Sequence, residues 1–128
     1  MSQSKALTRK LTNDQMTETL YGLAEEIFLL CAILTRRKLA HGFCDLAAHI
    51  QQLDSRVMPC NSSYSAADGV TPPAAEISVY LDISDSRPDD TNQRKYEDAV
   101  KEMEIYISYL DLLIAKNKPV LHKQEQTA

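Results

Sequence analysis

The chain has 128 residues and a mass of 14.4 kDa, with 44% hydrophobic and 25% charged residues, which is the composition of one globular domain and excludes a fibrous or largely disordered chain. Fourteen Lys and Arg against 18 Asp and Glu give a formal charge of −4 and a pI near 5.3, so the overall charge does not favour nucleic acid or an anionic membrane as a partner. With six Tyr, two Phe and no Trp, the core is expected to be small and aliphatic.

The N-terminal segment predicts no targeting signal. Residues 1–11 form a polar arm with Lys5, Arg9 and Lys10, and no apolar stretch of a secretory signal follows them. The longest apolar run, Ile27–Leu34, is far shorter than the ~20 residues that cross a bilayer. The cysteines are three in number and form no disulfide framework. We therefore expect an intracellular protein, cytoplasmic or nuclear, that is not secreted and has no membrane partner.

Apolar residues recur at steps of three and four in three segments, which is the spacing of a helix that packs along its length. These stripes predict helices over 12–35, 39–58 and 91–117. A capping box of Thr12 and Gln15 marks the start of the first helix. The stripe residues that we expect to bind a partner are Leu20, Leu23, Ile27, Leu30, Leu34, Leu46, Ile50, Leu53, Met103, Ile107, Leu110 and Ile114.

The first two stripes are out of phase with each other. The step from Leu34 to Leu39 is five residues, which rotates the apolar stripe by about 140° on a helix, and Arg36, Arg37 and Lys38 lie within it. Residues 12–58 are therefore predicted to be either a helical hairpin or one long kinked helix.

Residues 59–90 form a connector rich in Pro, Ser and Asp. Within it, Ile77–Ile83 alternates apolar and polar residues, as a strand does. Because a lone strand is unstable in water, this segment is expected to pair with its twin in a dimer or with a strand of another protein, or else to pack in extended form across the helices. Residues 118–128 are predicted to be a polar tail. The expected fold is one all-α domain over 1–128, whose three helices form a bundle or a coiled-coil-like assembly.

The segment around the break contains a possible catalytic pair. Arg36 is followed five positions later by His41, within an Ala-His-Gly sequence. This pattern resembles the R-x4-H motif of HEPN-type ribonucleases, in which Arg and His side chains from two protomers cut RNA without a metal ion. The resemblance covers eight residues and implies an all-helical, commonly dimeric domain in which Arg36 holds phosphate and His41 aids proton transfer. The simpler interpretation, which we favour, is a basic turn between helices with an exposed histidine.

The spacing of His41, Asp45 and His49 would place all three side chains on one face of the predicted second helix. Two imidazoles and a carboxylate suit zinc or iron. However, no fourth ligand is evident, and polar residues are expected on this face because it lies opposite the apolar stripe. We therefore favour a solvated face and expect no metal.

The sequence lacks the motifs of the common enzyme classes. It has no Gly-rich phosphate loop, no Cys-x-x-Cys pair, no nucleophile elbow and no His-Glu-x-x-His, so no cofactor is expected and enzymatic activity is not favoured. An acidic block over 82–104 could bind a basic partner or cover the Arg36–Lys38 corner.

The three apolar stripes exceed what a three-helix monomer would cover, so a homo- or hetero-oligomer is expected. The leading prediction is a non-enzymatic helical protein-protein interaction module, acting as a small subunit, adaptor or chaperone-like partner in a larger complex. The alternative is a metal-independent ribonuclease of the HEPN or toxin type, and only this alternative would bind nucleic acid.

Overall fold

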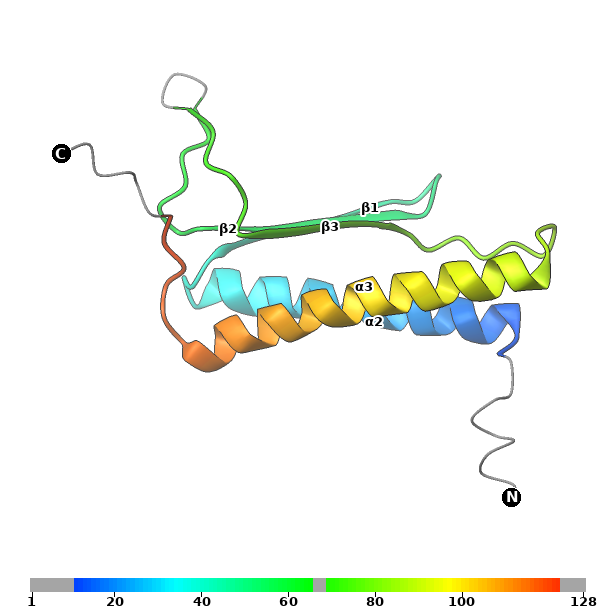
Figure 1. Ribbon diagram of the computed structural model, residues 1–128. Coiled ribbons are helices and arrows are strands. Elements are labelled where there is room, and N and C mark those ends of the chain that lie inside the picture. The colour runs from blue at the N-terminus through cyan, green and yellow to red at the C-terminus, as the bar shows by residue number, and fades with distance from the viewer. Residues whose placement is uncertain (1–10, 66–68, 123–128) are drawn as a thin grey trace.

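The computed structural model describes residues 11–65 and 69–122, which form two long helices and a three-stranded sheet. The elements follow in the order α2 (Asn13–Arg36), β1 (His41–Ala47), β2 (Gln52–Met58), β3 (Ala75–Tyr80) and α3 (Asp89–Lys116). The sheet is antiparallel, and both helices lie side by side on one of its faces (Figure 1). The expectation of an all-α bundle or coiled coil is therefore wrong: the fold has two layers, one of helices and one of strands.

The first helix agrees with its sequence signals. The backbone N–H of Thr12 donates to Gln15 Oε1 at 2.9 Å, and the N–H of Gln15 donates to Thr12 Oγ1 at 3.1 Å, which confirms the capping box. The helix ends at Arg36, and Lys38 then takes a positive φ of 60° as the N–H of Leu39 returns to the carbonyl of Leu34. The break in the apolar pattern is thus a turn that leads out of the helix and into a strand.

The segment predicted as a second helix, 39–58, is instead a β-hairpin. β1 and β2 pair in antiparallel register from His41 opposite Met58 to Ala47 opposite Gln52. The apolar residues spaced three and four apart in this segment do not all lie on the face that the fold buries. Phe43 and Ile50, which belong to that stripe, are 40% and 43% exposed. The hairpin buries alternate residues instead, as a strand with one covered face does.

The extended segment predicted over Ile77–Ile83 is confirmed in part: the strand is β3, Ala75–Tyr80, so residues 81–83 lie beyond its end, and its partner is a strand of the same chain. β3 pairs with β2 with Ile77 opposite Ser55 and Val79 opposite Leu53. Val79 of β3 is also buried in the core with the helices, which agrees in part with packing across the helices. Pairing with a twin or with another protein stays a prediction, because β3 is at the edge of the sheet. A third strand beside the hairpin provides the hydrophobic face that a two-stranded ribbon lacks in water.

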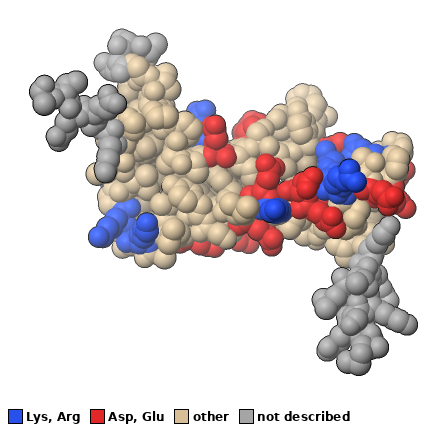
Figure 2. All heavy atoms as spheres, in the orientation of Figure 1, with Lys and Arg blue, Asp and Glu red and all other residues tan. Residues whose placement is uncertain are grey.

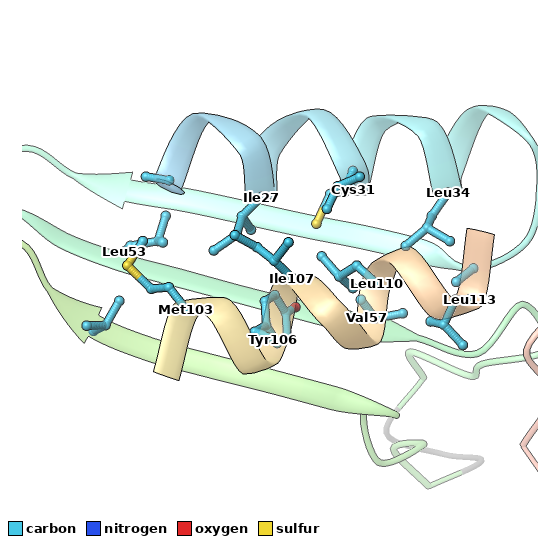
Figure 3. Close-up of a cluster of buried hydrophobic side chains, with 14 of the residues drawn as sticks. Ile27, Cys31, Leu34, Leu53, Val57, Met103, Tyr106, Ile107, Leu110 and Leu113 are labelled. Atoms are coloured by element: carbon cyan, nitrogen blue, oxygen red, sulfur yellow. The ribbon is translucent and has the colours of Figure 1, made fainter. Parts of the chain in front are cut away.

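The core lies between the helices and the central strand. Figure 3 shows side chains of α2 and α3 meeting over β2, among them Ile27, Leu34 and Met103. The fully buried residues of this cluster include Leu20, Ile27, Leu34, Leu53, Val57, Met103 and Leu110. Each such side chain contributes roughly 1.5–3 kcal/mol when it leaves water. The partners of the apolar stripes are thus largely within the chain.

The close approach of α2 to β1 explains why residue 42 is a glycine. A Cβ atom placed on Gly42 would lie 2.7 Å from the carbonyl oxygen of Cys31 and 2.8 Å from its Cα. The N–H of Gly42 also donates to Thr35 Oγ1 at 3.0 Å. Only a residue without a side chain therefore lets the helix pack this closely on the edge strand.

The start of α3 is held by a polar cluster. The Asp82 carboxylate forms ion pairs of 2.9 Å with Arg87 and 2.8 Å with Lys95. The fully buried Asn92 donates through Nδ2 to the carbonyl of Ser84 at 2.8 Å. Partial burial opposes the ionisation of Asp82, but its bonds to Lys95 and Arg87 outweigh burial and lower its pKa below the ordinary value. These contacts fix the loop between β3 and α3.

The two helices run in the same direction, because both begin at the right of Figure 1 and end at the left. The acidic start of α3 therefore lies at the far end of the molecule from the basic end of α2, and the acidic block does not cover Arg36–Lys38. Figure 2 shows one group of Lys and Arg at the lower left, where the helices end, and a second group at the right, where it adjoins the Asp and Glu that extend over the middle and right. Cations at helix C-termini are favourable for the helix dipole.

Beyond α3 the chain returns to the sheet. The predicted third helix, 91–117, is observed over Asp89–Lys116, and Asn117 terminates it with a positive φ of 51°. The N–H of Val120 donates to the carbonyl of Leu39, and its own carbonyl accepts from Cys60. The first part of the predicted tail is thus bonded to the fold, while residues 123–128 and the arm at 1–10 lie outside the described residues. No helix in the described part of the chain has both the length and the apolar character to cross a membrane.

Candidate binding face of the sheet

One face of the sheet is left uncovered by the helices. Along each strand, alternate residues point to opposite faces. The residues of β2 on the helix side, Leu53, Ser55 and Val57, are buried, and the residues that alternate with them, Asp54 and Arg56, are exposed. A cavity of about 650 Å³ lies against the three strands, lined by Phe43, Cys44, Asp45, Asp54, Ser55, Arg56, Glu76, Ile77 and Ser78. Its volume is within the range of about 300–1,000 Å³ found for ligand-binding pockets. We call the exposed side of the three strands the open face.

The register of the sheet arranges the open face in rows across the strands. Phe43, Arg56 and Glu76 form one row, because Phe43 lies opposite Arg56 and Arg56 lies opposite Glu76. Asp45 and Asp54 lie opposite each other in the next row. Like charges directly opposite each other destabilise a strand pair. The opposition of Asp45 and Asp54 therefore does not serve the stability of the isolated fold, whereas the opposite charges of Arg56 and Glu76 do.

No ion pair joins the carboxylates of the open face to a cation among the residues that the structure describes. Within the described residues, the side chains of Asp45, Asp54 and Glu76 form no hydrogen bond or ion pair. Among the described residues that line the cavity, Arg56 is the only basic one, and its guanidinium carbon lies 4.8 Å from the centre of the Phe43 ring. Three carboxylates and one guanidinium leave the cavity with a formal charge of −2.

An aromatic cluster forms one end of the open face. The ring of Tyr64 stacks on His41 with centroids 5.9 Å apart, and it meets Phe43 edge-on at 6.0 Å. The hydroxyl of Tyr64 lies 2.7 Å from Nδ1 of His41. Tyr64 belongs to the connector between β2 and β3, which rises from the sheet on the side away from the helices (Figure 1). Tyr64 is 51% exposed, so an apolar surface remains open beside the charged rows.

A buried polar cluster supports the open face from the helix side. The hydroxyl of Ser55 donates to the carbonyl of Phe43 at 2.8 Å and lies 2.9 Å from the hydroxyl of Tyr106. Burial raises the pKa of Cys31 and Tyr106, and it raises the pKa of Cys44 to about 12. Neither Cys31 nor Cys44 therefore carries much thiolate at neutral pH, so this cluster is suited to holding β1 and β2 in place and not to nucleophilic chemistry.

Most of the residues predicted to bind a partner lie in the core. Leu20, Ile27, Leu30, Leu34, Leu53, Met103, Ile107 and Leu110 are buried, and Leu23, Leu46 and Ile114 are partly buried against them. Ile50 is exposed at the turn of the hairpin. In this structure the stripes are therefore used to hold the helices to the sheet.

The possible catalytic pair of Arg36 and His41 is not placed as the resemblance implied. Arg36 is the last residue of α2, and His41 is the first residue of β1. The ribonuclease family is all-helical, whereas here the motif spans a helix end, a turn and a strand. The His41 ring instead contacts Tyr64, a member of the aromatic cluster.

The structure also separates the possible metal ligands. His41 and Asp45 are four residues apart on a strand, which corresponds to about 13 Å at 3.3 Å per residue, and His49 lies in the hairpin turn. In the described ranges, no group of three or more His, Cys, Asp or Glu residues could hold a metal ion.

Sequence reasoning missed the residues that make the open face, namely Phe43, Asp54, Arg56, Tyr64 and Glu76. The signal that could have identified this face is the alternation along β2, in which Leu53, Ser55 and Val57 are covered and Asp54 and Arg56 are exposed. It was obscured because the same segment also fits a helical spacing. The chain matches no protein-family model, no curated protein and no solved structure.

Proposed function

We propose that this protein is a non-enzymatic protein-interaction module, a small subunit or adaptor, that binds a partner protein on the open face. The observation that carries the proposal is the uncovered face of the sheet, with a cavity of about 650 Å³ lined by the Phe43 ring and by carboxylates that outnumber its one cation, and with the exposed ring of Tyr64 beside Phe43. Aromatic anchors within a charged surface are typical of protein interfaces.

The binding mode follows from the layers of the fold. The helices already cover one face of the sheet and use the apolar stripes to do so. An antiparallel sheet tolerates water on its second face when that face is polar, but Phe43 and Tyr64 add apolar surface to it. A partner would bury these rings and contact the charged rows beside them. We also propose an intracellular location, which the three free cysteines of the structure support.

Photocrosslinking in the cells that make the protein tests this function. The crosslinking amino acid p-benzoylphenylalanine replaces Ser78, which lines the cavity, or in a matched control Ser108, which is exposed on α3. We expect the Ser78 variant to form a covalent adduct with one defined protein. We expect Asp54→Lys in the same chain to abolish that adduct, because it reverses a charge within the cavity.

The result for the control decides the interpretation. Equal adducts from Ser78 and Ser108 would mean that the molecule is crosslinked without a preferred face. Adducts from Ser108 alone would place the partner on the helix layer, and both outcomes would refute binding through the open face.

A further inference from the structure

The charge of the open face indicates the chemistry of the partner. We propose, on the basis of the function proposed above, that the bound segment is an extended peptide that carries an arginine, and that its guanidinium lies between Asp45 and Asp54. These two carboxylates lie opposite each other on β1 and β2, and Glu76 lies two register positions away on β3, in the neighbouring row of the open face.

The first argument is charge complementarity. Asp45, Asp54 and Glu76 surround a cavity whose only cation, Arg56, is engaged over the Phe43 ring. A cation from outside would remove the like-charge opposition of the two aspartates. The same net charge opposes nucleic acid, because phosphates would meet three carboxylates. It also opposes a second copy of this face, because each copy would bring a formal charge of −2.

The second argument is the shape of the cation. A guanidinium is planar and has five N–H donors, so it can bond two carboxylates at once, whereas an ammonium is a compact point charge. Asp45 and Asp54 face each other across the strand pair, at Cβ separations of roughly 4.5–5.5 Å that are typical of opposed residues. A planar group with donors on both sides fits between two such carboxylates.

The third argument concerns the rest of the segment. The cavity is lined by residues of all three strands, and the exposed ring of Tyr64 lies at the end marked by Phe43. An extended chain that places arginine over the aspartates brings a side chain two residues away to the aromatic cluster, because alternate side chains of an extended peptide point to the same side. An apolar residue is expected at that position.

Binding of short peptides to the full chain tests the proposal. The probe is the fluorescein-labelled peptide Ser-Val-Ser-Arg-Ser-Val-Ser, which has an apolar residue two positions to either side of its arginine. The matched peptide has citrulline, which is uncharged, in place of the arginine. We expect the arginine peptide to bind more tightly than the citrulline peptide by about tenfold or more in fluorescence anisotropy at low salt. A lysine version should fall between the two.

Charge-matched variants of the protein provide the control. Asp45→Asn together with Asp54→Asn should weaken binding of the arginine peptide by about tenfold. Glu104→Gln together with Asp111→Asn removes the same number of charges from the exposed side of α3 and should change it by less than about twofold. Equal losses in the two double variants would overturn the proposal, because binding would then depend on net charge alone.

Amide chemical shifts separate the failure of this proposal from the failure of the proposed function. If both peptides shift the amides of Asp45, Asp54 and Glu76 equally, the open face binds peptides without selecting arginine, and the arginine assignment is wrong while the function stands. If neither peptide shifts them and Ser78 yields no crosslink in cells, both proposals fail. A dimer in sedimentation analysis that Arg56→Glu dissociates would show that a second copy occupies the face, which also overturns the arginine assignment.

Discussion

The close contact between α2 and β1 allows a quantitative test of the fold through Gly42→Ala. The added methyl group would lie 2.7 Å from the carbonyl oxygen of Cys31 and 2.8 Å from its Cα and Cβ. Favourable separations between non-bonded heavy atoms are about 3.5–4.0 Å, so α2 must move away from β1 by close to 1 Å. Because the nearest atoms belong to the backbone, no side-chain rotation relieves the clash.

The expected cost follows from overpacking a well-packed interface. Such substitutions destabilise by about 1–3 kcal/mol. The displacement also stretches the bond from the Gly42 N–H to Thr35 Oγ1, which is 3.0 Å long. At about 2.1 cal/mol/K of unfolding entropy per residue, each kcal/mol lowers the melting temperature of a chain this size by roughly 4 °C. Gly42→Ala should therefore lower it by about 4–11 °C.

Gly22→Ala is the matched control. Gly22 is exposed within α2, and a Cβ atom placed there meets no other atom within 4 Å. The substitution should stabilise the protein by about 0.5–1 kcal/mol, because alanine has the higher helix propensity. Circular dichroism during thermal and urea unfolding of the full chain measures both changes.

The sign of the Gly42 effect decides between two structures of residues 39–58. In a helix, Gly42→Ala would stabilise the protein, as Gly22→Ala does. In the hairpin it must destabilise, because α2 occupies the space of the methyl group. A Gly42→Ala protein as stable as the wild type would refute the close packing of α2 on β1 and with it the position of the hairpin.

Three further predictions follow from the electrostatics. Asp45→Asn should stabilise the isolated protein by about 0.2–1 kcal/mol in urea unfolding, because it removes the like charge opposite Asp54; a loss of stability would show that the pair is not repulsive. Asp82→Asn should cost about 1 kcal/mol at pH 7. Since the folded-state pKa of Asp82 is lowered, this difference should persist above the unfolded pKa of about 3.9 and vanish as the pH falls through the folded value; a constant difference would argue against the ion pairs. At pH 8, Cys60 should react with a thiol reagent well before Cys44, whose pKa is raised to about 12, and equal rates by mass mapping would contradict the burial of Cys44.

The helices could be predicted because their signals are local. The apolar stripe and the Thr12–Gln15 box lie within α2 itself, and the structure places that helix within one residue of the predicted ends. In α3 the stripe of Met103, Ile107 and Leu110 is continuous over its length. A helix repeats one hydrogen-bond geometry, so a pattern within a short window is enough to identify it.

The hairpin could not be predicted because the residues that define it have no local signal. Its turns use non-glycine residues with positive φ, Lys38 at 60° and Gln51 at 51°, so no Gly, Pro or Asn marks them in the sequence. On β1 the covered positions include Gly42 and Cys44. On β2 they include Ser55, whose buried hydroxyl is satisfied by Tyr106. Small and polar residues at covered positions hide the alternation of a strand.

The candidate site could not be predicted either, because it is formed by residues of the hairpin and of the connector that only the fold brings together. Asp45 and Asp54 are nine positions apart, and only the register of the hairpin sets them opposite each other. Tyr64 reaches Phe43 only because the connector rises over the sheet. The sequence by itself therefore determined two amphipathic helices and the need of their apolar faces for a partner, since those properties repeat locally along the chain. Only the tertiary structure decided that the partner is the chain's own sheet and that the open face gathers its charges, because strand pairing depends on contacts between distant residues.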